Sequence, residues 1–497
     1  MNSLAENKKK NLWMYPALAL SMMFCAAFTS PLYPHYVGLD SSMFLITAKG
    51  MLQGKICYLD LFDHKGPVLF WIEEAGYAIG GRTGVWILQC LFAFADLWLI
   101  GKICRLFRAN AIMPSLSFFA LLFYLFSHGD LTEEFCMPMI LLGFYLELRF
   151  LRSQEKTHPV GWAFVYGLLF GLMAFIRVNN AVILCSLLLC IAICLIIDRH
   201  WGNLLLNLCA GVTGLAIVAI PICLYYHEKG ALEDMLYATF LHNFMYAKNN
   251  THRLIFSGHF LFYAALYLPG FFAFFLFLIR SLHVEERRLY VSLCVATTIT
   301  YGMLLYTNAY EHYFVLGIPL FLAAVAVLLE GTEWMHPLEA LKQLLQMGSG
   351  KRRAAGAICC GIVCLYFLLS AYSACAPIYK CWLTDITENQ YRQIHESVQS
   401  IPEEERDSVI GYEVLADFYF FADIVPCYRY YTLQHWMTSD VRDVEGDFCR
   451  FVEDEKPLWV VTNKHSTLPL VLPMFIEEYS LVMSDDFVDY YRLQAEA

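Results

Sequence analysis

Residues 160–197, VGWAFVYGLLFGLMAFIRVNNAVILCSLLLCIAICLII, decide what class of protein this chain is. The stretch holds a single charged side chain, Arg177, near its middle. Because a helix needs about 20 apolar residues to cross the hydrocarbon core of a bilayer, the stretch predicts two transmembrane helices, 160–176 and 181–197. Arg177 then lies at the turn between them.

The rest of the chain has the same character. It is 59% hydrophobic and only 16% charged, with a mean hydropathy of +0.50, which is too apolar for a soluble protein. Further apolar runs occupy residues 12–29, 84–100, 111–127, 135–150, 203–226, 258–279, 289–306, 313–329 and 355–375. We therefore predict a polytopic α-helical membrane protein with about 11 transmembrane helices.

The distribution of Lys and Arg predicts the orientation of the chain in the cell membrane. With the N-terminus inside, the predicted inner segments carry 17 of these residues and the outer segments carry 8. This bias predicts a cytoplasmic N-terminus and, after eleven crossings, an extracytoplasmic C-terminus. The first apolar run is long for a signal peptide, so we interpret it as a retained anchor.

The sequence divides into a membrane body, residues 1–375, and a C-terminal domain, residues 376–497. The C-terminal part carries 23 acidic and 9 basic side chains. Helical patterns at 386–401, 413–422 and 441–454 alternate with short apolar strands at 408–412, 458–462 and 479–483, which predicts a small extracytoplasmic α/β domain. No basic stripe appears, so nucleic acid is not an expected partner.

The sequence pattern of the largest predicted outer loop, residues 30–83, predicts helices and not an unstructured linker. Ser41–Gln53 has the spacing of an amphipathic helix. A second helix is predicted to begin at Pro67, a residue that suits a first helical turn. We expect both to lie along the membrane surface as interfacial helices.

Polar and ionisable residues gather at the predicted outer ends of the spans. Charged groups at membrane depth are costly, so such a ring predicts a functional site. Lys65 also stands just before the Pro67 helix, where a cation meets the positive end of the helix dipole unless an anion such as phosphate lies between them. The candidate residues are Asp40, Asp60, Asp63, His64, Lys65, Glu133, Glu134, Arg177, Asn179, Glu311 and His312.

Six of these candidates also have a structural interpretation. Asp40 suits the cap of the helix that follows it. Lys65 and Arg177 suit lipid headgroups, which long basic side chains reach by snorkelling. Glu133 and Glu134 suit the first turn of a span, and His312 suits a belt of interfacial aromatic rings. The sequence leaves these alternatives open.

The order of the motifs resembles that of the GT-C membrane glycosyltransferases, specifically the bacterial relatives of protein mannosyltransferases and of the aminoarabinose lipid A transferase. The resemblance covers the membrane body, and residues 376–497 are similar to the extracytoplasmic domain of many members. Two departures, Asp40-Ser41 in place of Asp-Glu and Lys65-Gly66-Pro67 in place of Lys-Pro-Pro, leave the substrate open. The matching motifs are Asp40, Tyr58-x-Asp60, His64-Lys65-Gly66-Pro67, Thr132-Glu133-Glu134, Arg177 and Tyr310-Glu311-His312-Tyr313.

The resemblance implies transfer of a sugar from a polyprenyl-phosphate donor to an envelope glycan, lipid or protein on the outer face of the membrane. Asp40 is then the expected general base of an inverting displacement. Lys65, Arg177 and His312 are the expected ligands of the donor phosphate. The remaining substrate-binding candidates are Asp60, Asp63, His64, Glu133, Glu134, Asn179 and Glu311. No metal triad is visible in the sequence and no cofactor is expected, which leaves a need for a divalent metal open.

Two other functions fit parts of the sequence. A transporter or flippase for lipids or solutes would also place charged residues at membrane level. Its site should lie near the midplane between repeated halves, whereas these residues share one face and no inverted repeat is visible. An assembly subunit would explain the acidic C-terminal domain but not the first loop. The sugar, the acceptor, the oligomeric state and any pairing of the outer cysteines stay undetermined by the sequence.

Overall fold

The computed structural model describes residues 2–126, 129–153, 155–245, 260–305, 310–346, 350–433 and 443–494. The chain folds into two compact units, each described here by itself. The first unit contains Met1–Ala27, Ile87–Ile222 and Asn250–Cys375. The second contains Phe28–Trp86, Cys223–Asn249 and Ala376–Ala497.

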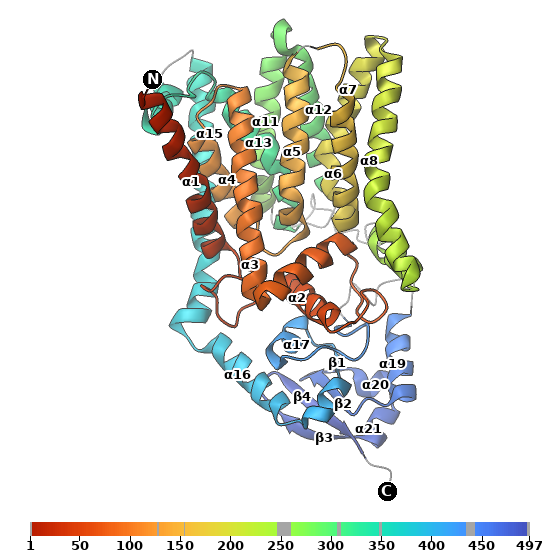
Figure 1. Cartoon of the computed structure of the whole chain (residues 1–497). Helices are drawn as coiled ribbons and strands as arrows, with labels where there is room; N and C mark the ends of the chain where they lie inside the picture. Colours follow the sequence, from red (N-terminus) through yellow and green to blue (C-terminus); the bar gives the residue numbers. More distant parts are fainter. Residues whose placement is uncertain are drawn as a thin grey trace. The chain divides into compact units, whose positions relative to one another are not determined.

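The first unit is a bundle of helices (Figure 1). A helix coincides with each of the predicted apolar runs. The predicted start of the run 258–279 and the last residues of the runs 111–127 and 289–306 lie outside the described residues. The run 84–100 belongs to the second half of α3, Pro67–Leu106. The others are α1 (Asn2–Ala26), α4 (Ile112–Leu125), α5 (Thr132–Ser153), α6 (Val160–Arg177), α7 (Val182–Ile197), α8 (Trp201–Glu228), α11 (Phe260–Ser281), α12 (Arg287–Leu304), α13 (Ile318–Leu328) and α15 (Gly350–Ile378).

Six helical segments among the described residues are long and apolar enough to cross a bilayer, which confirms a polytopic membrane protein. The predicted number of eleven crossings and their orientation stay predictions. The six segments are Pro67–Leu106, Val160–Ile197, Trp201–Glu228, Tyr263–Ser281, Glu311–Leu328 and Arg353–Leu383.

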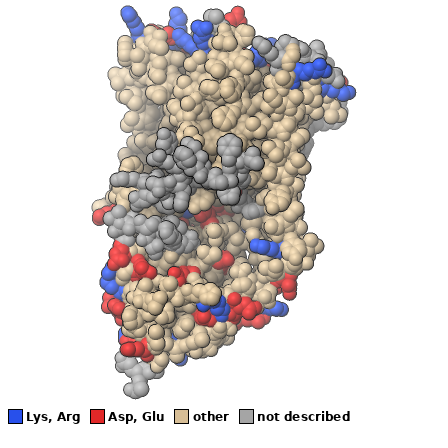
Figure 2. All heavy atoms as spheres, turned by 180° about the vertical axis from the view of Figure 1, so that it is seen from behind, with Lys and Arg blue, Asp and Glu red and all other residues tan. Residues whose placement is uncertain are grey.

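Helix α13 forms the core of the bundle. Every residue from Ile318 to Leu328 is buried, and α13 packs against α4, α5 and α11. Three alanines, Ala323, Ala324 and Ala326, let the neighbouring helices approach closely, which is how helices associate inside a membrane. Basic side chains gather at the upper end of this bundle in Figure 2.

In the second unit, the predicted loop helices are confirmed as helices. The first is α2, Leu39–Leu52. The second is the first part of α3, which begins at Pro67 as predicted and breaks at Gly80-Gly81. Gly81 has a φ of 59°, a conformation that glycine adopts without steric cost. Placement of the two helices along a membrane surface stays a prediction.

The C-terminal residues form a four-stranded sheet covered by helices, which confirms the predicted α/β domain. The strands are β1 (Val409–Tyr412), β2 (Trp459–Asn463), β3 (Tyr479–Ser484) and β4 (Val488–Leu493), in the order β1-β2-β4-β3. Strands β1 and β2 are parallel, and the other two pairs are antiparallel. The helices include α16 (Ile386–Gln399), α17 (Ala416–Ala422) and α19 (Val444–Glu455), and the first two residues predicted for the last of these, 441–442, lie outside the described residues.

Strand β4 was not predicted from the sequence. Asp489 and Arg492 interrupt its apolar character, although Val488 and Tyr490 are buried with the period of two that a half-buried strand requires. Within the same unit, α17 packs against both α2 and α16. The first loop and the C-terminal domain are therefore packed together as one structural unit.

Candidate functional site

The predicted residues fall into two clusters, one in each unit. The loop cluster, in the second unit, centres on Lys65. Its Nζ lies 3.5 Å from Oδ1 of Asp40 and 3.6 Å from Oδ1 of Asp63. The ammonium also lies 5.2 Å from the centre of the Phe44 ring, in cation–π geometry. A buried lysine held by two carboxylates and an aromatic face is a polar site inside a packed structure.

A strained turn holds Lys65 in place. Tyr58 has a φ of 78°, which is unusual for a residue that is not glycine. Its backbone N–H donates to the carbonyl of Leu61 at 2.8 Å, and its hydroxyl donates to the carbonyl of Lys65 at 2.8 Å. The Lys65 N–H in turn donates to Oδ1 of Asp63 at 2.9 Å. Such strain persists only where the surroundings determine the conformation, and it is typical of functional sites.

Asp63 is fully buried, and this burial dominates its electrostatics. Burial raises the pKa of the Asp63 carboxyl, because the charged form loses hydration, while Lys65 opposes the shift through its positive charge and its backbone hydrogen bond. The net direction is upward. Asp63 therefore holds a proton more readily than an exposed aspartate.

Asp40 has a different environment, because its side chain is 36% exposed. The alternative that Asp40 caps its helix is wrong: the cap is Gly38, whose N–H donates to the Ser41 hydroxyl at 3.0 Å. Asp40 instead occupies the first turn of α2, where a carboxylate interacts favourably with the helix dipole. An accessible carboxylate beside a buried ammonium is a suitable acceptor for a substrate proton.

The neighbours of the loop cluster include two residues that the sequence analysis missed. The His64 ring lies 3.8 Å from Asp63 and faces the His242 ring with centroids 5.5 Å apart. Asn243 donates from Nδ2 to the His64 carbonyl at 2.6 Å. The signal for them was a His-Asn pair within an otherwise apolar segment, 235–245. They bring η2 (Tyr237–His242) against the first loop.

Asp60 has a local structural role. Its Oδ2 accepts a hydrogen bond of 2.6 Å from the N–H of Ile56 and so closes the turn before Lys65. This contact holds the loop conformation and leaves the substrate-binding role of Asp60 a prediction.

The membrane cluster, in the first unit, centres on Arg177 at the end of α6. Its Nη1 lies 3.5 Å from Oε1 of Glu133, and its Nη2 donates to the Tyr313 hydroxyl at 2.7 Å. The guanidinium also lies 4.7 Å from the centre of the Tyr313 ring. Glu133 is buried at the start of α5 and accepts a second hydrogen bond, at 2.9 Å, from the Thr132 hydroxyl. Tyr313 is thus the partner of Arg177 that the sequence analysis did not assign.

Glu134 points into a separate network. Its Oε2 accepts hydrogen bonds of 2.9 Å from Gln89 Nε2 and from the backbone N–H of Asp130. Asp130 is itself buried and has a φ of 59°. Glu134 therefore supports the turn that precedes α5, in addition to its favourable position in the first helical turn.

The remaining candidates differ in burial. Asn179 is exposed, whereas its neighbour Asn180 is buried, so Asn180 is the amide that the fold encloses. Glu311 and His312 are half-buried and begin η5, Glu311–Gly317. The His312 ring packs edge-on against Tyr313 with centroids 4.5 Å apart. Arg177 and His312 thus share one aromatic neighbour.

In the described part of the chain, no group of three or more His, Cys, Asp or Glu side chains is arranged to hold a metal ion. The chemistry available from the described residues is proton transfer by carboxylates and charge stabilisation by Lys65 and Arg177. Cations of this kind are the usual protein ligands of phosphate groups.

Comparison with solved structures identifies the fold of the chain. Two crystal structures of ArnT from Cupriavidus metallidurans are similar to the chain at 15% sequence identity. The similarity to the structure with undecaprenyl phosphate bound has a TM-score of 0.56 and covers 97% of this chain and 97% of the ArnT chain. The apo structure has a TM-score of 0.57 and covers 98% of each. ArnT is a GT-C glycosyltransferase, so the predicted GT-C fold is confirmed.

Sequence comparison gives the family. No curated protein matches the chain. Residues 5–383 match the family described as "Putative competence-induced protein Ccs4 N-terminal domain". Because this match spans most of the chain, the protein belongs to the Ccs4 N-terminal domain family. It is a membrane protein with a GT-C fold.

Proposed function

We propose that the protein is a glycosyltransferase that moves a sugar from a polyprenyl-phosphate donor to a hydroxyl-bearing acceptor of the cell envelope, on the outer face of the membrane. The observation that carries this proposal is the contact of Lys65 with Asp40 and Asp63 within a GT-C fold. A cation that suits a phosphate lies there beside an accessible carboxylate that suits a proton, which supports the proposal. A structure of ArnT, which shares the fold, holds undecaprenyl phosphate.

Lys65 is proposed to bind the donor phosphate. At 3.5 and 3.6 Å, its contacts with the two aspartates are ion pairs and not short hydrogen bonds. An ammonium group carries three N–H donors, so the phosphate can replace one carboxylate as its partner. Burial raises the pKa of the Asp63 carboxyl, so Asp63 takes up a proton more readily than an exposed aspartate when a second negative charge approaches.

Arg177 is proposed as the second phosphate ligand. Its position is set by Glu133 and by the Tyr313 hydroxyl, so little side-chain entropy is lost when it binds an anion. The guanidinium presents several N–H donors in a plane and binds phosphate oxygens in pairs. His312, which packs on the same tyrosine, is proposed to assist.

Asp40 is proposed as the general base. It accepts the proton of the acceptor hydroxyl while that oxygen attacks the anomeric carbon, and the bond from this carbon to the phosphate oxygen breaks. Lys65 stabilises the negative charge that returns to the leaving phosphate. A single displacement inverts the anomeric carbon. The sugar hydroxyls are proposed to bind the remaining candidates, His64, Glu133, Glu134, Asn179 and Glu311 among them.

The proposal is tested by the lipids that co-purify with the full chain. Mass spectrometry of the solvent extract should find a polyprenyl phosphate or its glycosylated form, and the mass of the sugar would identify the donor. Phospholipids as the sole co-purified lipids, together with transport of a labelled lipid across vesicles, would contradict the proposal and support the flippase alternative.

A further inference from the structure

A pocket of about 370 Å³ lies in the second unit and plays no part in the proposed transfer reaction. Side chains of α2, α3, α16 and the end of α17 line it, together with the loop that precedes α2. Its volume is within the range of small-molecule sites. On α2 the pocket meets Lys49, nine residues after Asp40, and nine residues make two and a half helical turns. Lys49 and Asp40 therefore lie on opposite faces of α2, so the pocket is separate from the loop cluster.

Aromatic rings form much of the wall of this pocket. Tyr77, Tyr391 and Phe420 line it, and each is half-buried, so part of each side chain is accessible. The rings of His35 and His395 both stack on Tyr391, with ring centres 3.8 and 5.2 Å away. Stacked rings hold one another in place, so this wall is ordered before a ligand binds. Accessible aromatic rings suit a ligand with an apolar face of C–H groups.

The polar groups of the pocket include both donors and acceptors of hydrogen bonds. Lys49 donates to Oδ1 and to the backbone carbonyl of Asp423, each at 2.6 Å, contacts that use two of its three N–H groups. The Asp423 side chain is 69% exposed, so its carboxylate accepts further hydrogen bonds. His395 donates from Nδ1 to the Phe421 carbonyl at 3.1 Å, so Nε2 of the neutral ring is an acceptor. A hydroxyl group, which both donates and accepts, matches this mixture.

The charges around the pocket balance. Lys49 and Arg82 line it as cations, and Arg82 is held by backbone carbonyls of the first loop. Asp423 lines it as an anion, and Glu388, just outside the lining, lies 3.3 Å from the His35 ring. Burial lowers the pKa of His35 against the opposing effect of Glu388, so this ring is neutral near pH 7. Two positive and two negative charges favour neither an anionic nor a cationic ligand.

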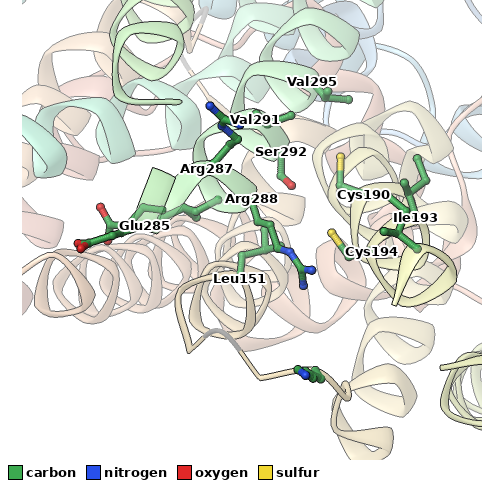
Figure 3. Close-up of a pocket in the computed structure, with 14 residues that line it drawn as sticks. Leu151, Cys190, Ile193, Cys194, Glu285, Arg287, Arg288, Val291, Ser292 and Val295 are labelled. Carbon is green, nitrogen blue, oxygen red and sulfur yellow. The ribbon is translucent and has the colours of Figure 1, made fainter. Parts of the chain in front are cut away.

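A larger cavity, of about 660 Å³, lies in the first unit between α7 and the start of α12 (Figure 3). Charges of both signs line it, Glu285 and Glu286 beside Arg287 and Arg288. Arg288 is already paired with Asp198, at 2.8 Å. None of the described residues that line this cavity is aromatic. The combination of accessible rings with hydrogen-bonding groups of both kinds is therefore a property of the pocket in the second unit.

We infer that the pocket in the second unit binds an uncharged sugar unit of a glycan, at a site separate from the proposed transfer site. A sugar has hydroxyl groups for the polar side chains and a C–H face for the rings. An acidic sugar would meet the carboxylate of Asp423. A lipid chain would remove water from Lys49, Arg82 and Asp423 without replacing its hydrogen bonds. An extended peptide pairs with the edge of a sheet, and the described lining includes no residue of β1–β4.

The experiment measures binding of defined trisaccharides to the purified full chain in nanodiscs by saturation-transfer NMR. The neutral probes are maltotriose, cellotriose and mannotriose. Trigalacturonic acid is the anionic probe, and a tyrosine-containing pentapeptide with blocked ends is the peptide probe. Phe420→Leu removes an accessible ring and keeps an apolar side chain, whereas Asp423→Asn removes the carboxylate at an exposed position. The matched controls on α19 are Phe451→Leu, at a half-buried ring, and Asp454→Asn, at an exposed carboxylate.

We expect at least one neutral trisaccharide to bind the wild type and both control variants with equal affinity. Phe420→Leu should lower this affinity about fivefold, the effect of one lost aromatic contact. Asp423→Asn should lower it about tenfold, because a hydrogen bond to a charged group is lost. Trigalacturonic acid should bind Asp423→Asn better than the wild type, since the repelling charge is gone.

The inference is overturned if no neutral trisaccharide binds the wild type. It is also overturned if Phe420→Leu and Asp423→Asn, folded by their thermal unfolding midpoints, bind the sugar as the wild type does, because the sugar then occupies another site. Stronger binding of trigalacturonic acid or of the peptide to the wild type would assign the pocket to another ligand class. None of these readouts depends on transfer activity, so failure here is distinguishable from failure of the proposed function.

Discussion

Lys49, on α2, places its Nζ 2.6 Å from Oδ1 of Asp423, the residue that ends α17 in a left-handed conformation. The same ammonium donates to the Asp423 backbone carbonyl at 2.6 Å. Helix α2 carries Asp40 in its first turn, so this contact joins the C-terminal domain to the helix of the proposed base. The pair gives the C-terminal domain a positioning role within its unit.

The energy of this pair should be small, because Asp423 is 69% exposed. Asp423→Asn removes the charge and keeps a residue that tolerates a left-handed conformation. A double-mutant cycle with Lys49→Met should give a coupling energy of about 0.5 kcal/mol, typical of an exposed ion pair. Thermal or denaturant unfolding of the four proteins measures it. Additive effects would show that the two side chains meet without stabilising the fold.

Asp40→Asn should nearly abolish transfer while leaving the thermal unfolding midpoint close to that of the wild type. Asparagine keeps the size of the side chain but cannot accept the substrate proton. Loss of a general base reduces the rate about a hundred- to ten-thousand-fold. The control is Glu388→Gln, which removes an exposed carboxylate that pairs with His35 in the same unit. Ordinary turnover in Asp40→Asn would reject the assignment and leave Asp60 and Asp63 as candidates.

Lys65→Met should weaken donor binding because it removes the charge and keeps much of the apolar stem. Titration with a purified polyprenyl phosphate, followed by tryptophan fluorescence, measures the affinity directly. Unchanged affinity in a folded Lys65→Met protein would show that Lys65 only balances the two aspartates.

Arg177→Met carries a complication, because it leaves Glu133 buried without its cation. Removal of one partner of a buried ion pair destabilises a protein by about 3 kcal/mol or more. The double variant Arg177→Met/Glu133→Gln removes both charges and should recover most of that stability. If Arg177 binds the donor, the affinity for polyprenyl phosphate should stay low in the double variant, although its stability is restored. Recovery of both stability and affinity would assign Arg177 a structural role alone.

The raised pKa of Asp63 predicts a dependence of stability on pH. Its folded pKa lies above its unfolded value near 3.8, so the native state binds more protons than the unfolded state in that window. The contribution of Asp63 to stability therefore falls as pH rises through the folded pKa. Asp63→Asn lacks this contribution. The unfolding midpoint of Asp63→Asn should therefore rise relative to that of the wild type as pH increases from about 4 to 7.

Lys65 provides an internal check on this prediction. Because Lys65 lowers the pKa of Asp63, the pH dependence attributed to Asp63 should extend to higher pH in a Lys65→Met background. The unfolding midpoints of Asp63→Asn and the wild type should therefore differ by an amount that varies with pH. A difference that is the same at every pH, with Lys65 present or replaced by Met, would contradict the argument from burial.

The orientation of the C-terminal domain is testable by labelling in intact cells. Glu404 is exposed in this domain and suits replacement with cysteine, in a variant whose Cys375, Cys381, Cys427 and Cys449 are serine. An extracytoplasmic domain predicts that a membrane-impermeant maleimide labels Glu404→Cys in intact cells. A requirement for permeabilised cells would place the domain inside and would remove the basis for a reaction on the outer face.

The sequence alone predicted the membrane class, the helices and the α/β character of residues 376–497. These features depend on hydrophobic length and period, which are local properties of the chain. The stretch 160–197 forms α6 and α7, as its apolar length predicts, and Pro67 begins a helix because its fixed φ suits a first turn. Family motifs likewise pointed to Asp40, Lys65 and Arg177, because the chemistry of a phosphate-linked donor needs these residue types.

Only the tertiary structure decided which groups meet. The amide of Asn243 reaches the His64 carbonyl across 179 residues of sequence, and Tyr313 reaches Arg177 across 136. No local pattern encodes such contacts, because they follow from how separate helices pack. Packing also buried Asp63 and left Asp40 accessible, although the two residues look alike in sequence. Their different chemistry arises from solvation, which the fold controls and the residue type does not.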